Sequence, residues 1–166
     1  MLKLFKKLLS YLEKYPRFKR YTDEITGFRG TERKFALSIA TGIFIGTAMP
    51  PGFQIMTAVP LAMFLRANVL IACFFTLISN PFTFPPIIYT SFRLGSYVTG
   101  ISMQWKVLSD FISNPTSEQF LLIGGTGFGI YMLGGLIQAL IYTPVSYLCG
   151  IYLYRNLPAV RKKREE

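Results

Sequence analysis

The sequence predicts an all-α integral membrane protein, built from re-entrant or broken helices around two proline-rich breaks and preceded by an amphipathic helix. Between Phe35 and Phe92 the chain carries a single charged residue, Arg66. Breaks at 49–52 and 80–86 divide this apolar run into pieces of roughly 12 to 15 residues, whereas a transmembrane helix needs about 20. A broken helix is tolerated in lipid only where its backbone groups are buried in protein or line a polar cavity, so the breaks indicate a site.

Composition and charge agree with a membrane location. Of the 166 residues, 51% are hydrophobic and 16% charged, whereas roughly a quarter of residues in soluble domains are charged. Residues 1–34 hold ten of the 18 Lys and Arg, and residues 155–166 hold five more. We therefore divide the chain into a basic cytoplasmic segment (1–34), a membrane domain (35–154) and a basic cytoplasmic tail (155–166). The positive-inside rule places both ends in the cytoplasm and requires an even number of crossings.

The first fifteen residues are expected to form an amphipathic helix. Leu2, Phe5 and Leu9 recur at helical spacing, and lysines such as Lys6 occupy the other face. These lysines also interrupt the apolar core that a cleavable signal peptide would need. The helix lies in the membrane interface or packs on the protein's own cytoplasmic surface, and both alternatives remain open. Pro16 is expected to end it.

The first membrane element is expected to be a re-entrant hairpin. Residues 35–49 form its first arm, and residues 53–65 run back from a turn at Pro50, Pro51 and Gly52. Each arm is too short to cross the membrane alone.

The second element repeats this arrangement. Residues 67–79 and 87–105 form its two arms, and the second arm is long enough to reach the far side. The break between them contains Asn80, Pro81, Thr83, Pro85 and Pro86. Two such units resemble the paired discontinuous helices of transporter folds, whose half-helix ends meet near the midplane.

The stretch from Gln119 to Tyr154 carries no charge. As a straight helix it would measure about 54 Å, against a hydrocarbon core of about 30 Å. It must therefore bend, extend past the bilayer or turn back, and Pro144 is the expected kink. Asn114 and Pro115 suit the N-cap and first helical position.

Glycines four residues apart provide candidate packing faces. Gly42 and Gly46 form one such pair, and Gly125 and Gly129 form another. This spacing lets helices approach closely, either within one subunit or across a homo-oligomer interface.

The residues expected for catalysis are missing from the sequence. It contains no histidine, and Asp110 and Glu118 are the only carboxylates between residues 35 and 154. Cys73 and Cys149 lie in apolar segments, where a buried cysteine behaves as a small hydrophobe. We therefore expect no enzymatic activity, no metal site and no cofactor.

The polar groups that remain at membrane depth are mainly guanidinium and amide groups. The candidate ligand-binding residues are Gln54, Arg66, Asn68, Asn80, Thr83 and Arg93. An arginine in the membrane costs at least about 2.5 kcal/mol, so it normally faces a cavity or pairs with another group. An anionic ligand would supply the missing charge, and a phosphate suits the planar guanidinium. Backbone donors at half-helix N-termini would assist. The alternative is that both arginines snorkel to the headgroups.

These segments resemble a bacterial inner-membrane family known as domain of unknown function 2062. The matching residues are the run 42–46, the run 50–54, the run 66–68 and the run 80–83, with Pro85 and Pro86. The resemblance covers about residues 25 to 160 and implies a bacterial inner-membrane location, but no activity. The architecture is also similar to small bacterial membrane proteins with facing re-entrant hairpins, which are implicated in returning polyprenyl-phosphate or phospholipid across the membrane.

The sequence therefore favours a membrane protein that binds and translocates an anionic lipid, such as a phospholipid or polyprenyl-phosphate, or a small phosphate-bearing solute. Membrane lipids are its expected partners. Nucleic acid is not expected, because the +10 net charge flanks apolar runs and forms no stripe on a polar domain. The alternatives are a non-transporting envelope scaffold, whose breaks would be tightly packed, and a channel for ions or small solutes, whose polar residues would line a pore.

Overall fold

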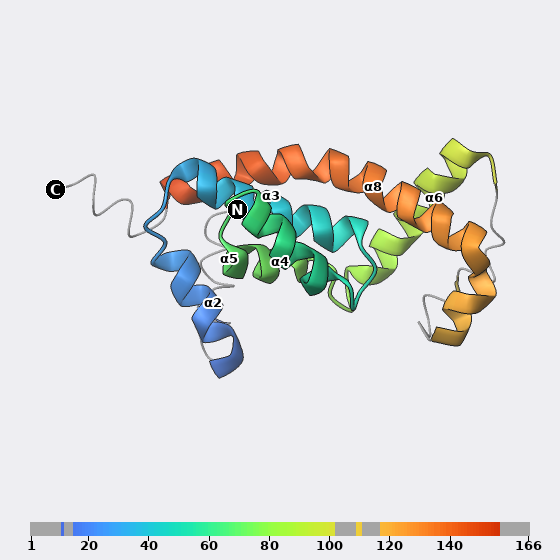
Figure 1. Ribbon diagram of the computed structural model, residues 1–166, viewed down its shortest axis with the longest axis horizontal. Helices are drawn as coiled ribbons and strands as arrows, with labels where there is room; N and C mark the ends of the chain where they lie inside the picture. Colours follow the sequence, from blue (N-terminus) through green and yellow to red (C-terminus); the bar gives the residue numbers. More distant parts are fainter. Residues whose placement is uncertain (1–10, 12–14, 102–108, 111–116, 157–166) are drawn as a thin grey trace.

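The computed structural model describes residues 11, 15–101, 109–110 and 117–156. Within this part of the chain all regular structure is helical, and the molecule is elongated (Figure 1). The helices are α2 (Pro16–Thr26), α3 (Glu32–Ala48), α4 (Gln54–Phe64), α5 (Val69–Thr76), α6 (Phe84–Thr99) and α8 (Ser117–Arg155). The all-α fold class is thus confirmed. Most of the expected helix over residues 1–15, and the cap at Asn114 and Pro115, lie outside the described residues. The arm expected over residues 87–105 instead begins at Phe84 and ends at Thr99, because Gly100 adopts a left-handed φ of 71° and caps the helix.

Helix α8 runs along the length of the molecule and packs against both α3 and α6 (Figure 1). Its last turns pack against the start of α3, where Gly150 meets the backbone of Ala36, and Gly135 meets the backbone of Thr47 at the end of α3. Nearer its beginning, Gly134 packs against the backbone of Ser91 in α6, and Ile130 packs against Gly95, further along α6. Both α3 and α6 therefore run antiparallel to α8, and they follow one another along its length.

A tight turn reverses the chain between α3 and α4. In this turn the backbone N–H of Phe53 donates to the carbonyl oxygen of Pro50 at 3.3 Å, and Gly52 has a φ of 96°. Proline in the second position and glycine with positive φ in the third are typical of a type II turn. The turn directs α4 back along α3, where Ala62 near the end of α4 clusters with Leu37 near the start of α3.

Helix α5 runs parallel to α3 at close range. Gly42 packs against the backbone of Ala72, and Gly46 packs against the backbone of Thr76. This pair of glycines therefore serves packing within one subunit. In the other pair, a Cβ added at Gly125 or Gly129 would meet no atom of the described chain within 4 Å.

Helix α2 is an element that we did not predict. Pro16 was expected only to end a helix, but here it occupies the first turn of a new one. A proline is compatible with that position because the first helical N–H groups have no partner inside the helix. On α2, Thr22 and Ile25 are fully buried, and the ring of Tyr21 packs on Phe74 of α5 at 5.8 Å.

The break in the last helix also differs from the expected position. Gly124 leaves the helical conformation, with φ 68° and ψ 174°, whereas Pro144 lies inside α8. Glycine adopts a positive φ without steric cost. The loss of one backbone N–H at a proline can be accommodated in a long packed helix.

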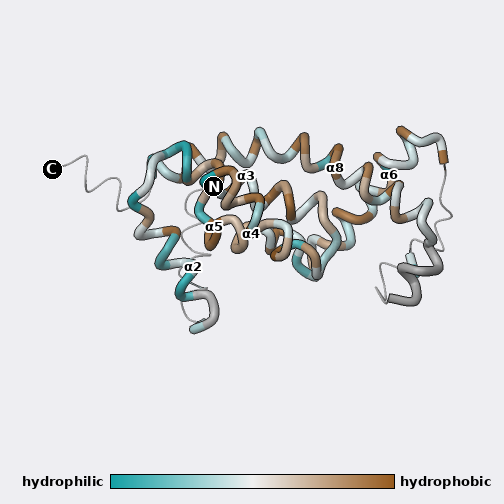
Figure 2. The backbone as a smooth tube through the Cα atoms, viewed as in Figure 1, coloured by the Kyte–Doolittle hydropathy of each residue, from teal (hydrophilic) through white to brown (hydrophobic). Residues whose placement is uncertain are grey.

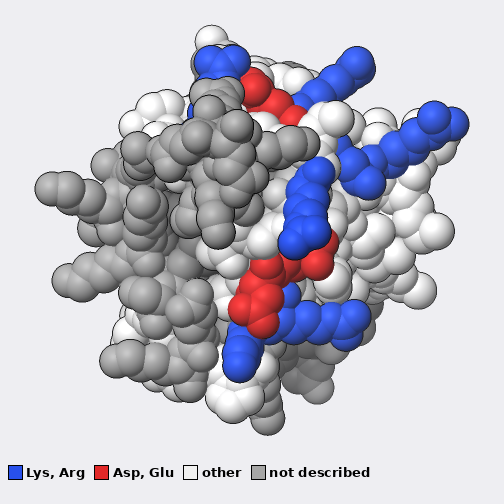
Figure 3. Space-filling model, turned by 90° about the vertical axis from the view of Figure 1, so that its left-hand side faces the viewer, with Lys and Arg blue, Asp and Glu red and all other residues white. Residues whose placement is uncertain are grey.

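Charge and hydropathy divide the molecule along its length. Polar residues concentrate at the end that carries α2 and the end of α8 (Figure 2). Seen from that end, Lys and Arg lie among Asp and Glu (Figure 3). There Arg155 pairs with Glu32 at 2.9 Å, and the Tyr154 hydroxyl donates to the Gly30 carbonyl at 2.7 Å. We call this region the charged end. The start of α3 and the end of α8 thus meet at one end of the molecule.

The stretch Gly124–Arg155 of α8 is long and apolar enough to cross a membrane, and it is the one such helix in the described residues. Only 22% of its most apolar part is buried inside the molecule. Large apolar side chains are also exposed elsewhere, including Phe64, Phe82 and Leu148. An apolar surface of this extent is typical of contact with lipid or with another protein.

Candidate functional site

The two breaks meet around the side chain of Gln54. Its Nε2 donates to the carbonyl oxygens of Gly46 and Met49, at 3.2 and 3.1 Å, and to Ser79 Oγ at 2.6 Å. Gln54 is 9% exposed and begins α4, whereas Ser79 directly precedes the second break. One amide thus joins the end of α3, the start of α4 and the end of the α5 segment. We call this group the Gln54 junction.

Asn80 and Thr83 bind their own loop. Asn80 Oδ1 accepts from the backbone N–H groups of Phe82 and Thr83, at 2.9 and 3.1 Å. Thr83 Oγ1 accepts from the Asn80 N–H at 3.0 Å and donates to the Ile78 carbonyl oxygen. Asn80 is exposed and Thr83 is half-buried. These side chains therefore shape the second break first, and their exposed surfaces remain available to a ligand.

The start of α6 has few backbone donors to offer an anion. The Phe84 N–H donates to the Asn80 carbonyl at 2.8 Å, and the Ile87 N–H donates to the Thr83 carbonyl at 3.1 Å. Pro85 and Pro86, which lie between them, have no N–H. The expected donation from half-helix N-termini therefore does not apply at the second break.

Asn68 lies away from the Gln54 junction, at the charged end. Its Oδ1 accepts from the Ile71 N–H at 3.0 Å and caps α5. Its Nδ2 donates to Glu24 of α2 at 2.6 Å, and its backbone N–H donates to Ser38 Oγ at 2.7 Å. The side chain of Asn68 thus joins α2 to α5, and its backbone N–H adds the contact with α3.

Arg66 lies near the same level as Asn68. It precedes Asn68 by two residues in the turn between α4 and α5, and its side chain is exposed. Asn68 contacts Ser38, which follows Ala36 by two residues, and Ala36 packs on Gly150 of α8. Arg66 therefore lies close to the charged end.

Arg93 lies far from that level. It stands on α6 between Ser91, which packs on Gly134, and Gly95, which packs on Ile130. At 1.5 Å per residue, the rise along α8 between the levels of the two arginines is about 25 Å. The structure therefore does not bring the two arginines together around one headgroup at mid-depth, since charge-assisted hydrogen bonds span only about 2.7–2.9 Å. Arg93 is also exposed.

A second buried polar contact was not predicted. Ser91 Oγ of α6 donates to Gln138 Oε1 of α8 at 2.9 Å, and Gln138 Nε2 donates to the Tyr142 hydroxyl at 3.2 Å. Ser91 is fully buried and Gln138 is 2% exposed. The position of Gln138 inside an uncharged 36-residue stretch was the available signal for this contact, but its partner depends on the register of α6 against α8.

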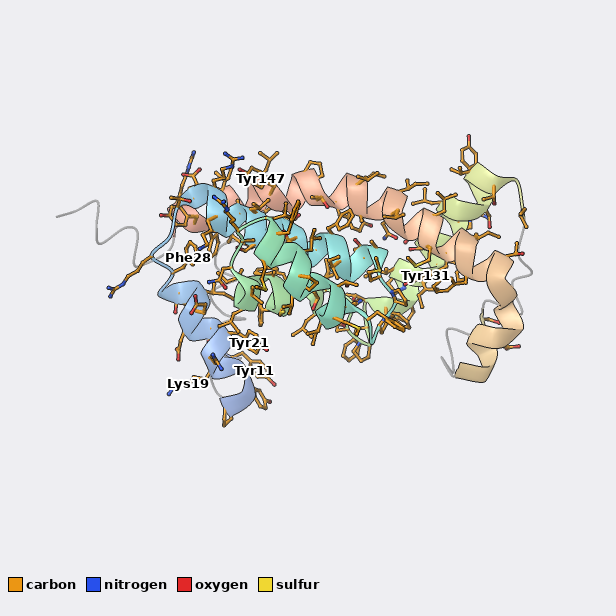
Figure 4. All side chains as sticks on the ribbon, in the orientation of Figure 1. Tyr11, Lys19, Tyr21, Phe28, Tyr131 and Tyr147 are labelled. Atoms are coloured by element: carbon orange, nitrogen blue, oxygen red, sulfur yellow. The ribbon has the colours of Figure 1, made fainter. Side chains whose placement is uncertain are left out.

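Aromatic packing fixes the two ends of the structure. At the charged end the ring of Phe28 lies 5.2 Å from Phe35 and 6.4 Å from Tyr154 (Figure 4). Toward the other end, Tyr131 packs on Phe92 at 5.6 Å. In the described residues no group of His, Cys, Asp and Glu is arranged to hold a metal ion, and Cys73 and Cys149 are free thiols.

Residues 16–164 match the family described as an uncharacterized protein conserved in bacteria, DUF2062. The match covers most of the chain, which therefore belongs to this family. The comparison with curated proteins gave no match, and neither did the comparison with solved structures.

Proposed function

We propose that this protein is a multi-pass inner-membrane protein that binds the phosphate group of an anionic lipid and passes it between the leaflets. In this proposal α8 crosses the membrane, and α5 and α6 together form a broken crossing in the opposite direction. The α3–α4 hairpin enters and leaves from the charged end, and both termini are cytoplasmic.

One observation carries the proposal. Arg66, at the border of the charged end, and Arg93, on α6, are both exposed, at levels about 25 Å apart along α8. This separation is close to the hydrocarbon thickness of about 30 Å. Neither guanidinium forms a hydrogen bond or ion pair with a residue in the described part of the chain. Each arginine is thus suited to a phosphate in a different leaflet, since a charge in lipid otherwise needs a partner.

The second break offers an intermediate position. Ser79 belongs to the Gln54 junction at the end of α3, so Asn80 lies between the levels of Arg66 and Arg93. A headgroup moving over the surface would meet the exposed Asn80 amide there, while its acyl or prenyl chain stays in lipid. Such a carrier needs no cofactor.

Reconstitution in liposomes tests this proposal. Fluorescent phosphatidylglycerol is added, and dithionite then quenches the label in the outer leaflet. We expect the wild type to expose inner-leaflet label faster than protein-free liposomes, and Arg93→Ala to slow this at least tenfold. Arg93→Lys should restore part of the rate, because an ammonium keeps the charge but loses the bidentate fork.

Two further measurements distinguish a lipid headgroup from a soluble phosphate ester as the substrate and test the proposal itself. Uptake of radiolabelled glycerol phosphate without lipid scrambling would identify a soluble phosphate ester as the substrate. The proposal would be refuted if liposomes with the wild-type protein scrambled lipid no faster than empty ones, took up no glycerol phosphate, and native mass spectrometry found no retained anionic lipid.

A non-transporting scaffold is a second candidate, favoured by the Gln54 junction. The two amide hydrogens of Gln54 are taken up by three acceptors of the protein itself. A break that is filled by protein contacts suits a static role. Retained lipid without scrambling in the liposome assay would favour this candidate.

A further inference from the structure

Arg66 has an unusual backbone conformation. Its φ is 55°, and no other non-glycine residue in the described part of the chain has a positive φ. L-residues avoid this left-handed region because Cβ approaches the carbonyl oxygen, whereas glycine adopts it freely.

The turn around Arg66 is one that normally contains glycine. The Ala67 N–H donates to the Ala62 carbonyl at 2.8 Å, and the Arg66 N–H donates to the Met63 carbonyl at 3.0 Å. This pair of hydrogen bonds defines a Schellman motif, and Arg66 stands at its left-handed position. Glycine would therefore end α4 with less strain than arginine does.

The surroundings of the Arg66 side chain are apolar. The three preceding residues, Met63, Phe64 and Leu65, are 65%, 83% and 36% exposed. The Arg66 guanidinium forms no hydrogen bond or ion pair within the described residues, whereas Arg155 at the same end pairs with Glu32 at 2.9 Å. Arg66 thus presents an unpaired cation at the border between exposed apolar side chains and the charged end.

From these observations we infer that Arg66 binds the phosphate of an anionic lipid in the leaflet on the charged side, and that its strained position serves this contact. The three exposed apolar side chains of the same turn contact the lipid chains below that phosphate. This inference rests on the proposed lipid binding and adds the leaflet and the residue at which a headgroup is first held. Strained backbone positions cluster at ligand-binding and active sites, where the surrounding structure holds them in place.

Arg66→Gly separates binding from stability. Relief of the left-handed strain is expected to raise the apparent Tm in detergent by about 2–4 °C. Loss of the guanidinium is expected to weaken saturable phosphatidylglycerol binding, measured by native mass spectrometry, at least tenfold. Arg66→Lys should keep the wild-type Tm and bind with intermediate affinity. The control is Arg33→Ala, which removes an exposed charge at the same end without altering the turn; its Tm and binding should resemble the wild type.

Two outcomes contradict the inference in different ways. Arg66→Gly that binds phosphatidylglycerol as tightly as a binding-competent wild type would show that Arg66 is not the headgroup ligand, and the proposed function would stand. A wild type without saturable phosphatidylglycerol binding would overturn the inference together with lipid binding itself.

Discussion

Gly134→Ala should separate α6 from α8 and destabilise the fold. A Cβ at Gly134 would overlap the Ser91 carbonyl oxygen, lie 2.6 Å from its carbon and lie 2.8 Å from the Gly95 nitrogen. Ordinary contact begins at 3.4 Å, and both neighbours are backbone, so the two helices must move apart by more than about 1 Å. The Ser91–Gln138 hydrogen bond, 2.9 Å long, would then be stretched beyond useful length.

The magnitude follows from three contributions. Overpacking a close helix contact costs about 1–3 kcal/mol, and losing a buried interhelical hydrogen bond costs about 1 kcal/mol more. Replacing glycine by alanine in a helix stabilises the helix by about 1 kcal/mol. The net loss of about 2 kcal/mol should lower the apparent Tm by about 4–8 °C.

Thermal unfolding in detergent, followed by circular dichroism, measures this change. Gly129→Ala is the matched control, because a Cβ at Gly129 meets no described atom within 4 Å. Its apparent Tm should be equal to that of the wild type or slightly higher. Equal Tm values for Gly134→Ala and Gly129→Ala would show that α6 and α8 are not packed in this register.

Three further predictions concern the Gln54 junction, the position of α2 and the topology. Gln54→Ala leaves Ser79 and two carbonyl groups without their donor and should lower the apparent Tm by about 5 °C; an unchanged Tm would show that the junction is not formed. Asn68→Asp keeps the cap on α5 but places a carboxylate against Glu24, so amide hydrogen exchange should accelerate in α2 while α5 stays protected; unchanged exchange in α2 would contradict the contact. Cysteine probes at Ser10 and Glu165, in a chain with both native cysteines replaced, should resist impermeant reagents outside spheroplasts, and rapid labelling of either would refute cytoplasmic termini.

The breaks could be predicted from the sequence because their signals are local. Proline at the second position and glycine at the third suffice to define the turn after α3, and Asn80 with three prolines suffices for the second break. Helix ends were predicted less well, because a local signal such as proline does not say whether a helix starts, ends or continues there. Pro16 and Pro144 are both prolines, yet one starts a helix and the other lies inside one. Only the packing around each proline decides between these outcomes.

The arrangement of the candidate site depended on register, which a single sequence does not contain. Gln54 and Ser79 were near the predicted breaks, but their contact requires α5 to run parallel to α3. We grouped Arg66 with Arg93 because both are arginines in apolar segments. The antiparallel packing of α3 and α6 on α8 places them far apart. The strain at Arg66 could not be predicted either, since glycine is the residue that normally indicates such a turn.

The distribution of close contacts also restricts which element could move in the lipid transport that we propose. Glycines fix α3 on α5 and α6 on α8 at backbone distance, so neither pair can slide without losing its register. Helix α4 buries only one stripe, Gln54, Ala58 and Ala62, and two of these residues have minimal side chains. Its ends are the Gly52 turn and the Arg66 turn, and the three hydrogen bonds from Gln54 are its main polar attachment. In the proposed transport, release of Gln54 and movement of α4 would therefore break the fewest of these contacts, and the strained Arg66 turn would move with α4.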